Sequence, residues 1–237
     1  MQSISLLIKV LWSPGETMYL LSKNPRVLAP LLFLCLFSLV TVGGAFTKID
    51  FGDIYMRLVE KSPQGKNMTD DQKAQMKKIM SSPIVGKVAV PAFSVIGTLV
   101  TILLVAGIYF LVFSLVGREG GFKQYLSLTS FAFVPIIFSS IATTVRAFTM
   151  DTSSLMLDEL GSLSAGIFVD RDTASPVVFA LANSIDLVTI WILCLLIIGY
   201  GFVTRKSVSK GTRAGVVVAV FLVYVGIKLA SAAIRGV

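Results

Sequence analysis

The sequence has no histidine and few charged residues, and each scarcity disfavours a class of function. Histidine is the commonest metal ligand and the usual general base near neutral pH, so its absence weighs against metal centres and acid–base catalysis. Charged residues make up only 14% of the chain, against about 25% in an average soluble domain. The two cysteines, Cys35 and Cys194, lie in apolar runs, where we expect small buried hydrophobic residues, with a disulfide as the less favoured alternative.

Catalytic sequence patterns are missing as well. The chain contains no HExxH and no GxSxG, and "GREGG" at 117–121 lacks the strand–helix context of a phosphate-binding loop. Aspartyl chemistry inside a membrane needs two carboxylates at membrane depth, and only Asp186 is placed there. We therefore expect no enzyme, no cofactor and no metal site.

Hydrophobic residues are abundant, at 55% of the 237 residues, and the mean hydropathy is +0.84. Several runs exceed the roughly 18 apolar residues typical of a membrane-spanning helix. The sequence thus predicts an all-α, polytopic integral membrane bundle. Its net charge of +8 is attributed to membrane topology, because no basic cluster is dense enough for nucleic acid.

The apolar runs predict five transmembrane helices in a membrane domain over 27–237. They lie at about 27–46, 88–116, 122–149, 177–203 and 214–234. Residues 1–26 form a cytoplasmic segment with an amphipathic helix in the interface, whose apolar face comprises Ile4, Leu7, Ile8, Leu11 and Trp12. Residues 47–87 form an extracytoplasmic loop, in which Thr69 and Gln72 have capping-box spacing and predict a helix over about 70–80.

Lysine and arginine in the short loops indicate the orientation. The basic residues of three segments are Lys9, Lys23 and Arg26; Arg118 and Lys123; and Arg205, Lys206, Lys210 and Arg213. The link between the third and fourth spans is instead acidic, with Asp151, Asp158, Glu159, Asp170 and Asp172. The positive-inside rule therefore places the N-terminus in the cytoplasm and the C-terminus outside, with 47–87 long enough to obey the rule weakly.

One carboxylate, Asp186, falls inside the fourth span, roughly 13 Å from its outer end at about 1.5 Å per residue. A carboxylate at that depth costs about 2–3 kcal/mol unless it is paired or hydrated. Lys228 in the fifth span is the expected partner, and Arg146 in the third is the second candidate. The alternatives are that both cations extend to the interface while Asp186 caps a helix end or bonds to serines, or that Asp186 belongs to an ion or proton site.

The third span carries polar residues around Pro135, including Ser139, Ser140, Thr143 and Thr144. Proline lacks an N–H and breaks helical hydrogen bonding, so we expect an interruption there. The hydroxyl groups could line a hydrophilic cavity. More commonly such groups contact neighbouring helices or bond to their own backbone.

Several stretches resemble one known family: "WSPGETMYLLSKNPRVLAPL", "SPQGKNMTDDQKAQMKKIMSSP", "GGFKQYLSLTSFAFVPIIFSSI" and "SIDLVTIWILCLLIIGYGFVTRKSVSKGTRAG". Together they resemble the bacterial branch of the Yip domain family, the Ypt/Rab-interacting proteins. The resemblance implies a five-helix integral membrane domain with a cytoplasmic N-terminus. For eukaryotic members it implies roles in vesicle trafficking, membrane shaping and GTPase recruitment, but their Asp-Leu-x-Gly-Pro signature is absent here.

We expect a non-enzymatic scaffold or adaptor for membrane organisation or trafficking-like processes in a bacterial cytoplasmic membrane. The expected contacts with lipids or a cytoplasmic protein are Trp12, Glu16, Arg205, Lys206, Lys210 and Arg213. For the basic loop, topology determination alone is the simpler interpretation. A second copy of the chain is a further candidate partner. The alternative function is a small transporter or channel that uses Asp186, Lys228 and Arg146.

Overall fold

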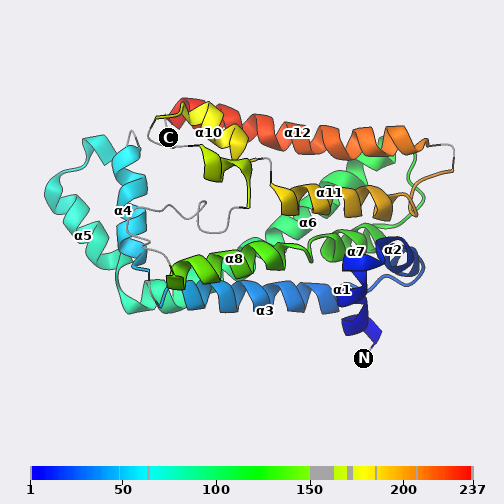
Figure 1. The fold of residues 1–237 in the computed structure, drawn as a ribbon, viewed down its shortest axis with the longest axis horizontal. Coiled ribbons are helices and arrows are strands. Elements are labelled where there is room, and N and C mark those ends of the chain that lie inside the picture. The colour runs from blue at the N-terminus through cyan, green and yellow to red at the C-terminus, as the bar shows by residue number, and fades with distance from the viewer. Residues whose placement is uncertain are drawn as a thin grey trace. The chain divides into compact units, whose positions relative to one another are not determined.

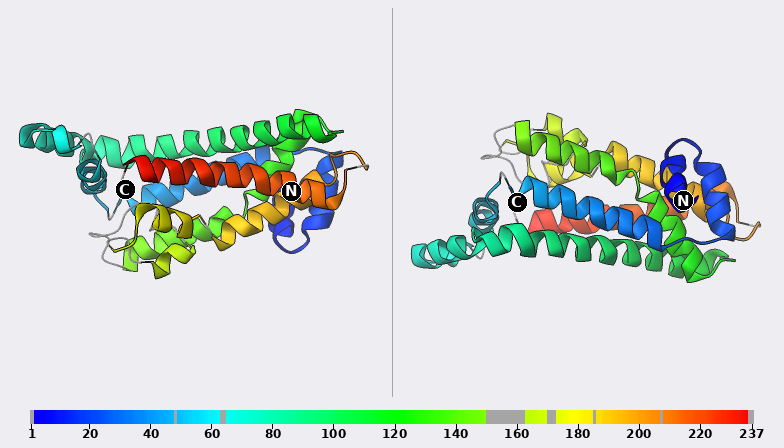
Figure 2. Two further views of the ribbon diagram at one scale, coloured as in Figure 1. Left: turned by 90° about the horizontal axis from the view of Figure 1, so that it is seen from above. Right: turned by 90° about the horizontal axis from the view of Figure 1, so that it is seen from below.

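The computed structural model describes residues 2–47, 49–62, 65–149, 163–169, 173–184, 186–206 and 208–235. Throughout these ranges the regular structure is helical, and the only β-type pairings are two isolated bridges. The all-α prediction is therefore confirmed. Figure 1 and Figure 2 show the helices and their order along the chain.

The chain divides into two compact units. Unit 1 comprises Met1–Leu36, Ile96–Ile137 and Leu187–Tyr224, and unit 2 comprises Phe37–Val95, Phe138–Asp186 and Val225–Val237. The helices that lie wholly or largely in unit 1 are α1 (Gln2–Trp12), α2 (Pro14–Lys23), α6 (Val90–Val116), α7 (Phe122–Ala132), α11 (Leu187–Tyr200) and α12 (Lys210–Arg235). Helix α3 (Leu28–Ala45) contributes to both units. The remaining elements are α4 (Phe51–Lys61), η1 (Gly65–Asn67), α5 (Asp70–Met80), η2 (Val85–Ala89), α8 (Ile136–Thr149), η3 (Ala165–Phe168) and α10 (Pro176–Ala182).

Four described segments are long and apolar enough to cross a membrane. They are Leu28–Ala45, Val85–Val116, Phe122–Thr149 and Lys210–Ala233. Large apolar side chains on them, such as Leu32, Leu104 and Leu222, are exposed. Exposed leucines on several long helices are what a lipid-facing surface requires, so the chain is a multi-pass membrane protein.

The predicted span at 177–203 differs from the structure, which has two shorter helices there, α10 and α11. Helix α10 ends at Ala182, and the Ser184 hydroxyl donates a hydrogen bond of 2.7 Å to the Ala180 carbonyl oxygen. Asn183, Ser184 and Asp186 have short polar side chains that compete for backbone hydrogen bonds, so they favour helix ends over helix interiors. A hydropathy average over the whole run does not register this interruption.

The segment Phe122–Thr149 is interrupted at Pro135, as its sequence predicts. Helix α7 ends at Ala132 and α8 begins at Ile136. The turn between them has short-range hydrogen bonds, from the Val134 N–H to the Phe131 carbonyl oxygen at 3.2 Å and from the Ile136 N–H to the Phe133 carbonyl oxygen at 3.0 Å. These bonds replace the helical pattern that the proline cannot complete.

In unit 2, α4 and α5 form a helical hairpin. Helix α5 covers Asp70–Met80, the residues for which the capping box predicted a helix, and both bonds of the box between Thr69 and Gln72 are present. Lys77 Nζ lies 2.7 Å from Asp53 Oδ1, and this carboxylate raises the pKa of Lys77. Gly52 permits the close approach, because a Cβ atom there would overlap Ser81.

Candidate functional site

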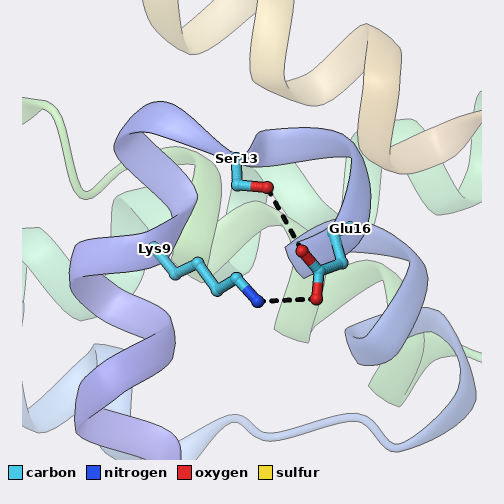
Figure 3. A network of polar contacts seen from close by, with 3 residues as sticks. All are labelled: Lys9, Ser13 and Glu16. Atoms are coloured by element: carbon cyan, nitrogen blue, oxygen red, sulfur yellow. Dashed lines mark hydrogen bonds and ion pairs between the residues drawn. The ribbon is translucent and has the colours of Figure 1, made fainter.

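Helices α1 and α2 form a hairpin whose turn is fixed by an ion pair (Figure 3). Lys9 Nζ lies 2.6 Å from Glu16 Oε1, and the Ser13 hydroxyl donates to Glu16 Oε2 at 3.4 Å. The hydrogen bond from Lys9 holds the pKa of Glu16 below its usual range. Pro14 occupies the first turn of α2, where its missing N–H costs nothing. Glu16, predicted to contact a partner, is thus engaged within its own hairpin.

Helix α1 has two apolar sides instead of the single face expected from its sequence. Leu6, Leu7 and Val10 are buried in the core of unit 1. Ile4, Ile8 and Trp12, spaced four residues apart, are 65%, 51% and 71% exposed, and we call them the α1 stripe. Residues four apart lie on one side of a helix, so the stripe is continuous. Leu7 and Leu11, which the sequence places on the same face as the stripe, instead pack against the core of unit 1.

Helix α2 and the segment that follows it are attached to α7 by two side chains. The Ser127 hydroxyl accepts a hydrogen bond of 2.9 Å from the Arg26 N–H and donates one of 3.0 Å to the Arg26 carbonyl oxygen. Gln124 Nε2 donates to the Ser22 carbonyl oxygen at 2.6 Å, and its Oε1 accepts from the Gly121 N–H at 2.7 Å. The "FKQY" stretch that suggested the family therefore connects elements of unit 1.

Aromatic side chains fill the centre of unit 1. The rings of Tyr125 and Tyr200 are stacked with centroids 5.0 Å apart, and Tyr109 and Phe113 lie 5.1 and 5.5 Å from Tyr200. Thr129 donates its hydroxyl proton to the Tyr125 carbonyl oxygen, so in the 2.7 Å contact between Tyr200 and Thr129 the tyrosine is the donor. The hydroxyls of Tyr109 and Tyr125 donate to the carbonyl oxygens of Val217 and Val203, at 3.0 and 3.3 Å. All three tyrosine hydroxyls are therefore hydrogen-bonded, which indicates a structural role.

Two basic loops are joined at one end of unit 1. Arg118 and Thr204 form an antiparallel bridge, and the Arg205 N–H donates to the Gly117 carbonyl oxygen at 2.8 Å. Gly117 has φ +137°, a conformation that side chains disfavour. The ring contact between Tyr19 and Phe202, at 5.7 Å, adds α2 to this end. The three segments that the positive-inside rule places on one side are therefore in mutual contact.

The cations in and beside the two basic loops fall into two groups. Arg118 lies 4.0 Å over the Phe110 ring, and Arg213 donates to the carbonyl oxygens of Val208 and Gly201, with the shortest bond 2.9 Å long. Both therefore stabilise the fold. The second group, which we call the basic end, consists of Lys123, Arg205, Lys206 and Lys210. These four are exposed, and no described carboxylate lies within ion-pair distance of them.

The three predicted intramembrane charges, Asp186, Lys228 and Arg146, all belong to unit 2 and are half-buried. Asp186 forms an isolated backbone bridge with Ser164, whose hydroxyl donates to Asn183 Oδ1 at 2.7 Å. The pairing of Asp186 with Lys228 or Arg146 stays a prediction. The acidic residues Asp151, Asp158, Glu159, Asp170 and Asp172 lie outside the described residues.

The threonines of α8 bond along their own helix. The Thr143 hydroxyl donates to the Ser139 carbonyl oxygen at 2.9 Å, and that of Thr144 donates to the Ser140 carbonyl oxygen at 3.0 Å. Such bonds to the preceding turn are common for threonine in membrane helices. Among the described residues, no group of histidine, cysteine, aspartate and glutamate is arranged to hold a metal ion.

Comparison with known proteins identifies the family of the chain. No curated protein and no solved structure matches the chain. The family model of the Yip1 domain, however, matches residues 8–230, which include the turn of the α1–α2 hairpin, nearly all of the four long apolar segments and the loops of the basic end. Because this match covers nearly the whole sequence, the chain belongs to the Yip1 domain family.

Proposed function

We propose that the protein is a non-enzymatic scaffold or adaptor of a bacterial cytoplasmic membrane, with its N-terminus in the cytoplasm and its C-terminus outside. The observation that carries this proposal is the convergence at one end of unit 1. The α1–α2 hairpin and the two basic loops come from distant parts of the sequence, yet they form one assembly rich in lysine and arginine. A cytoplasmic surface with uncompensated cations can recruit lipids or an acidic protein partner.

The orientation predicts which residues a reagent can reach from each side. In a background without Cys35 and Cys194, a cysteine at Lys206 is expected to react with a membrane-impermeant maleimide in inverted vesicles but not in intact cells. A cysteine at Gln75, exposed on α5, should show the opposite pattern. Both positions reacting from the same side would contradict the proposed topology.

The adaptor role predicts protein contacts at the same end. A photo-reactive amino acid at Arg205 is expected to give protein adducts in intact cells. The matched control is the same residue at Leu222, which is 59% exposed on an apolar helix and should meet lipid. Adducts that are no more abundant at 205 than at 222, measured after purification under denaturing conditions, would refute the adaptor role.

A small transporter or channel is the second candidate, favoured by the interruption between α10 and α11. Transporters of several folds bind solutes where transmembrane helices are broken, because exposed backbone groups there can coordinate the substrate. Asp186 lies at this break. A carboxylate at a helix break is the combination that such a site would use.

A charge exchange separates a structural ion pair from a transport site. If Asp186 pairs with Lys228, then Asp186→Asn and Lys228→Met each lower the melting temperature in detergent, and the double variant Asp186→Lys/Lys228→Asp recovers part of the loss. The expected loss for each single variant is about 1–3 kcal/mol. The same exchange with Arg146 tests the other partner.

The transport hypothesis expects a different result. Asp186→Asn would leave the melting temperature unchanged but would abolish a proton- or sodium-driven flux into proteoliposomes. Loss of flux without loss of stability would overturn the scaffold proposal. Loss of stability with recovery in the exchanged double variant would assign the charges to helix packing.

A further inference from the structure

We infer that the basic end and the α1 stripe together form a binding site for anionic phospholipids of the surrounding bilayer. The stripe would lie at the boundary between headgroups and acyl chains, and the four cations would contact lipid phosphates. This inference deepens the proposed function and rests on its assignment of this end to a membrane surface. It identifies the ligand class as a lipid headgroup with net negative charge.

The first support is the unusual composition of α1. Its inner side is already occupied, because Leu6, Leu7 and Val10 are buried in the core of unit 1. The α1 stripe on the other side is left more than half exposed by the part of the chain that the structure describes. An isoleucine–isoleucine–tryptophan row is costly in water, whereas tryptophan is favoured at the membrane interface. The occupant that suits this row is therefore the outer part of a bilayer.

The second support is the direction of α1. Within unit 1, α1 runs across the axis of α11, while the unit 1 parts of α6 and α12 run along it (Figure 1). In a bilayer crossed by α6 and α12, α1 would lie close to the plane of the membrane surface. That is the orientation of interfacial amphipathic helices, whose apolar side enters the bilayer by about 5–10 Å.

The third support is the availability of the cations. Arg118 and Arg213 are committed to Phe110 and to loop carbonyl oxygens, and so contribute to folding. The basic end, in contrast, has four exposed side chains on α7, on the loop after α11 and at the start of α12. The hydrogen bonds between residues 117–120 and 203–205 fix Arg205 and Lys206 beside the start of α7. Anionic headgroups supply the compensating charge.

Figure 1 shows that the elements which carry the stripe and the cations lie at the same end of unit 1. Helices α1 and α2, the start of α7 and the link between α11 and α12 lie together there, and both views of Figure 2 agree. One bilayer surface can therefore meet the apolar stripe and the basic end at the same time. The combination of two signals is what stable interfacial binding requires.

The chain provides its own reporter for a test. It contains two tryptophans, Trp12 in the stripe and Trp191 in α11. The variant Trp191→Phe leaves Trp12 as the sole tryptophan, so its fluorescence reports only on the stripe. The intact chain is placed in nanodiscs of phosphatidylcholine, and a fraction of the lipid is replaced by phosphatidylglycerol with brominated acyl chains, which quench tryptophan at contact.

The expected result is preferential quenching by the anionic lipid. Brominated phosphatidylglycerol should quench Trp12 more than brominated phosphatidylcholine does at equal mole fraction, and bromine near the headgroup should quench more than bromine deep in the chains.

Each lysine near an anionic surface strengthens binding about five-fold. Lys206→Gln with Lys210→Gln should therefore lower the relative affinity for phosphatidylglycerol by about 25-fold. High salt should weaken the preference because it screens charge.

The matched control is Lys73→Gln with Lys78→Gln on α5, which removes the same charge from unit 2 and should leave the quenching unchanged. Equal quenching by the two lipids, or equal effects of the two double variants, would overturn the inference. Quenching of Trp12 by aqueous iodide in place of brominated lipid would also overturn it. The adaptor role fails separately, because it depends on protein adducts at Arg205 and not on lipid preference.

Discussion

Replacing Tyr200 with alanine is expected to lower the free energy of unfolding by about 3–5 kcal/mol. The Tyr200 side chain is fully buried at the end of α11 and contacts the rings of Tyr109, Phe113 and Tyr125. Its removal leaves a cavity bordered by rigid rings from α6 and α7, which cannot collapse without moving those helices. Thermal and denaturant unfolding in detergent would measure the loss, with the monodisperse fraction in gel filtration as the readout.

Two control variants separate the contributions at this position. Tyr200→Phe keeps the ring and removes only the hydroxyl that donates to Thr129, so we expect a loss of about 1 kcal/mol. Tyr224→Ala removes the same atoms from a side chain that is 60% exposed on α12, and its effect should stay within about 0.5 kcal/mol. If Tyr200→Ala were as mild as Tyr224→Ala, the aromatic cluster would not be the stabilising centre of unit 1.

The second large effect is expected at Ser127. Ser127→Ala should destabilise the protein by about 2–4 kcal/mol, because both the N–H and the carbonyl oxygen of Arg26 would lose their partner. The loss should be local at first, since the affected segment joins α2 to α3. Hydrogen–deuterium exchange would then show faster exchange in α1 and α2 than in α6.

Ser130→Ala is the matched control for this variant. Ser130 is also buried on α7, but its hydroxyl donates to the Leu126 carbonyl oxygen of its own helix at 2.6 Å. That oxygen keeps its helical hydrogen bond when the hydroxyl is removed, so we expect a loss below about 1 kcal/mol. A loss at Ser130 equal to that at Ser127 would show that the contact with Arg26 contributes little.

Local signals in the sequence predicted local structure well. The capping box at Thr69 and Gln72 predicted α5, and Pro135 predicted the division between α7 and α8, since each feature acts through backbone atoms within a few residues. The membrane segments could be predicted from hydropathy, because hydropathy is also a property of residues that are neighbours in the sequence. The fourth span was the exception, because the average over its apolar residues concealed the polar residues Asn183, Ser184 and Asp186, which favour a helix end.

The candidate site depended on tertiary contacts that no local pattern encodes. Arg213 and Lys206 occupy the same basic stretch, yet only the structure shows that Arg213 donates to backbone carbonyls while Lys206 is exposed. Likewise, the periodicity of α1 could identify apolar residues but not which of its two apolar sides the core would cover. Ser127 could be read only as a polar residue in an apolar run, because its partner Arg26 lies 101 residues away.

The short length of α11 has a consequence for the bilayer itself. With 14 residues at about 1.5 Å each, α11 extends roughly 21 Å, against a hydrocarbon thickness of about 30 Å. Helix α6, with 27 residues, extends roughly 40 Å. Where α11 meets lipid, its short apolar length leaves a mismatch that a bilayer can relieve by thinning around the helix. We therefore expect the protein to accumulate where the membrane is thin or easily deformed.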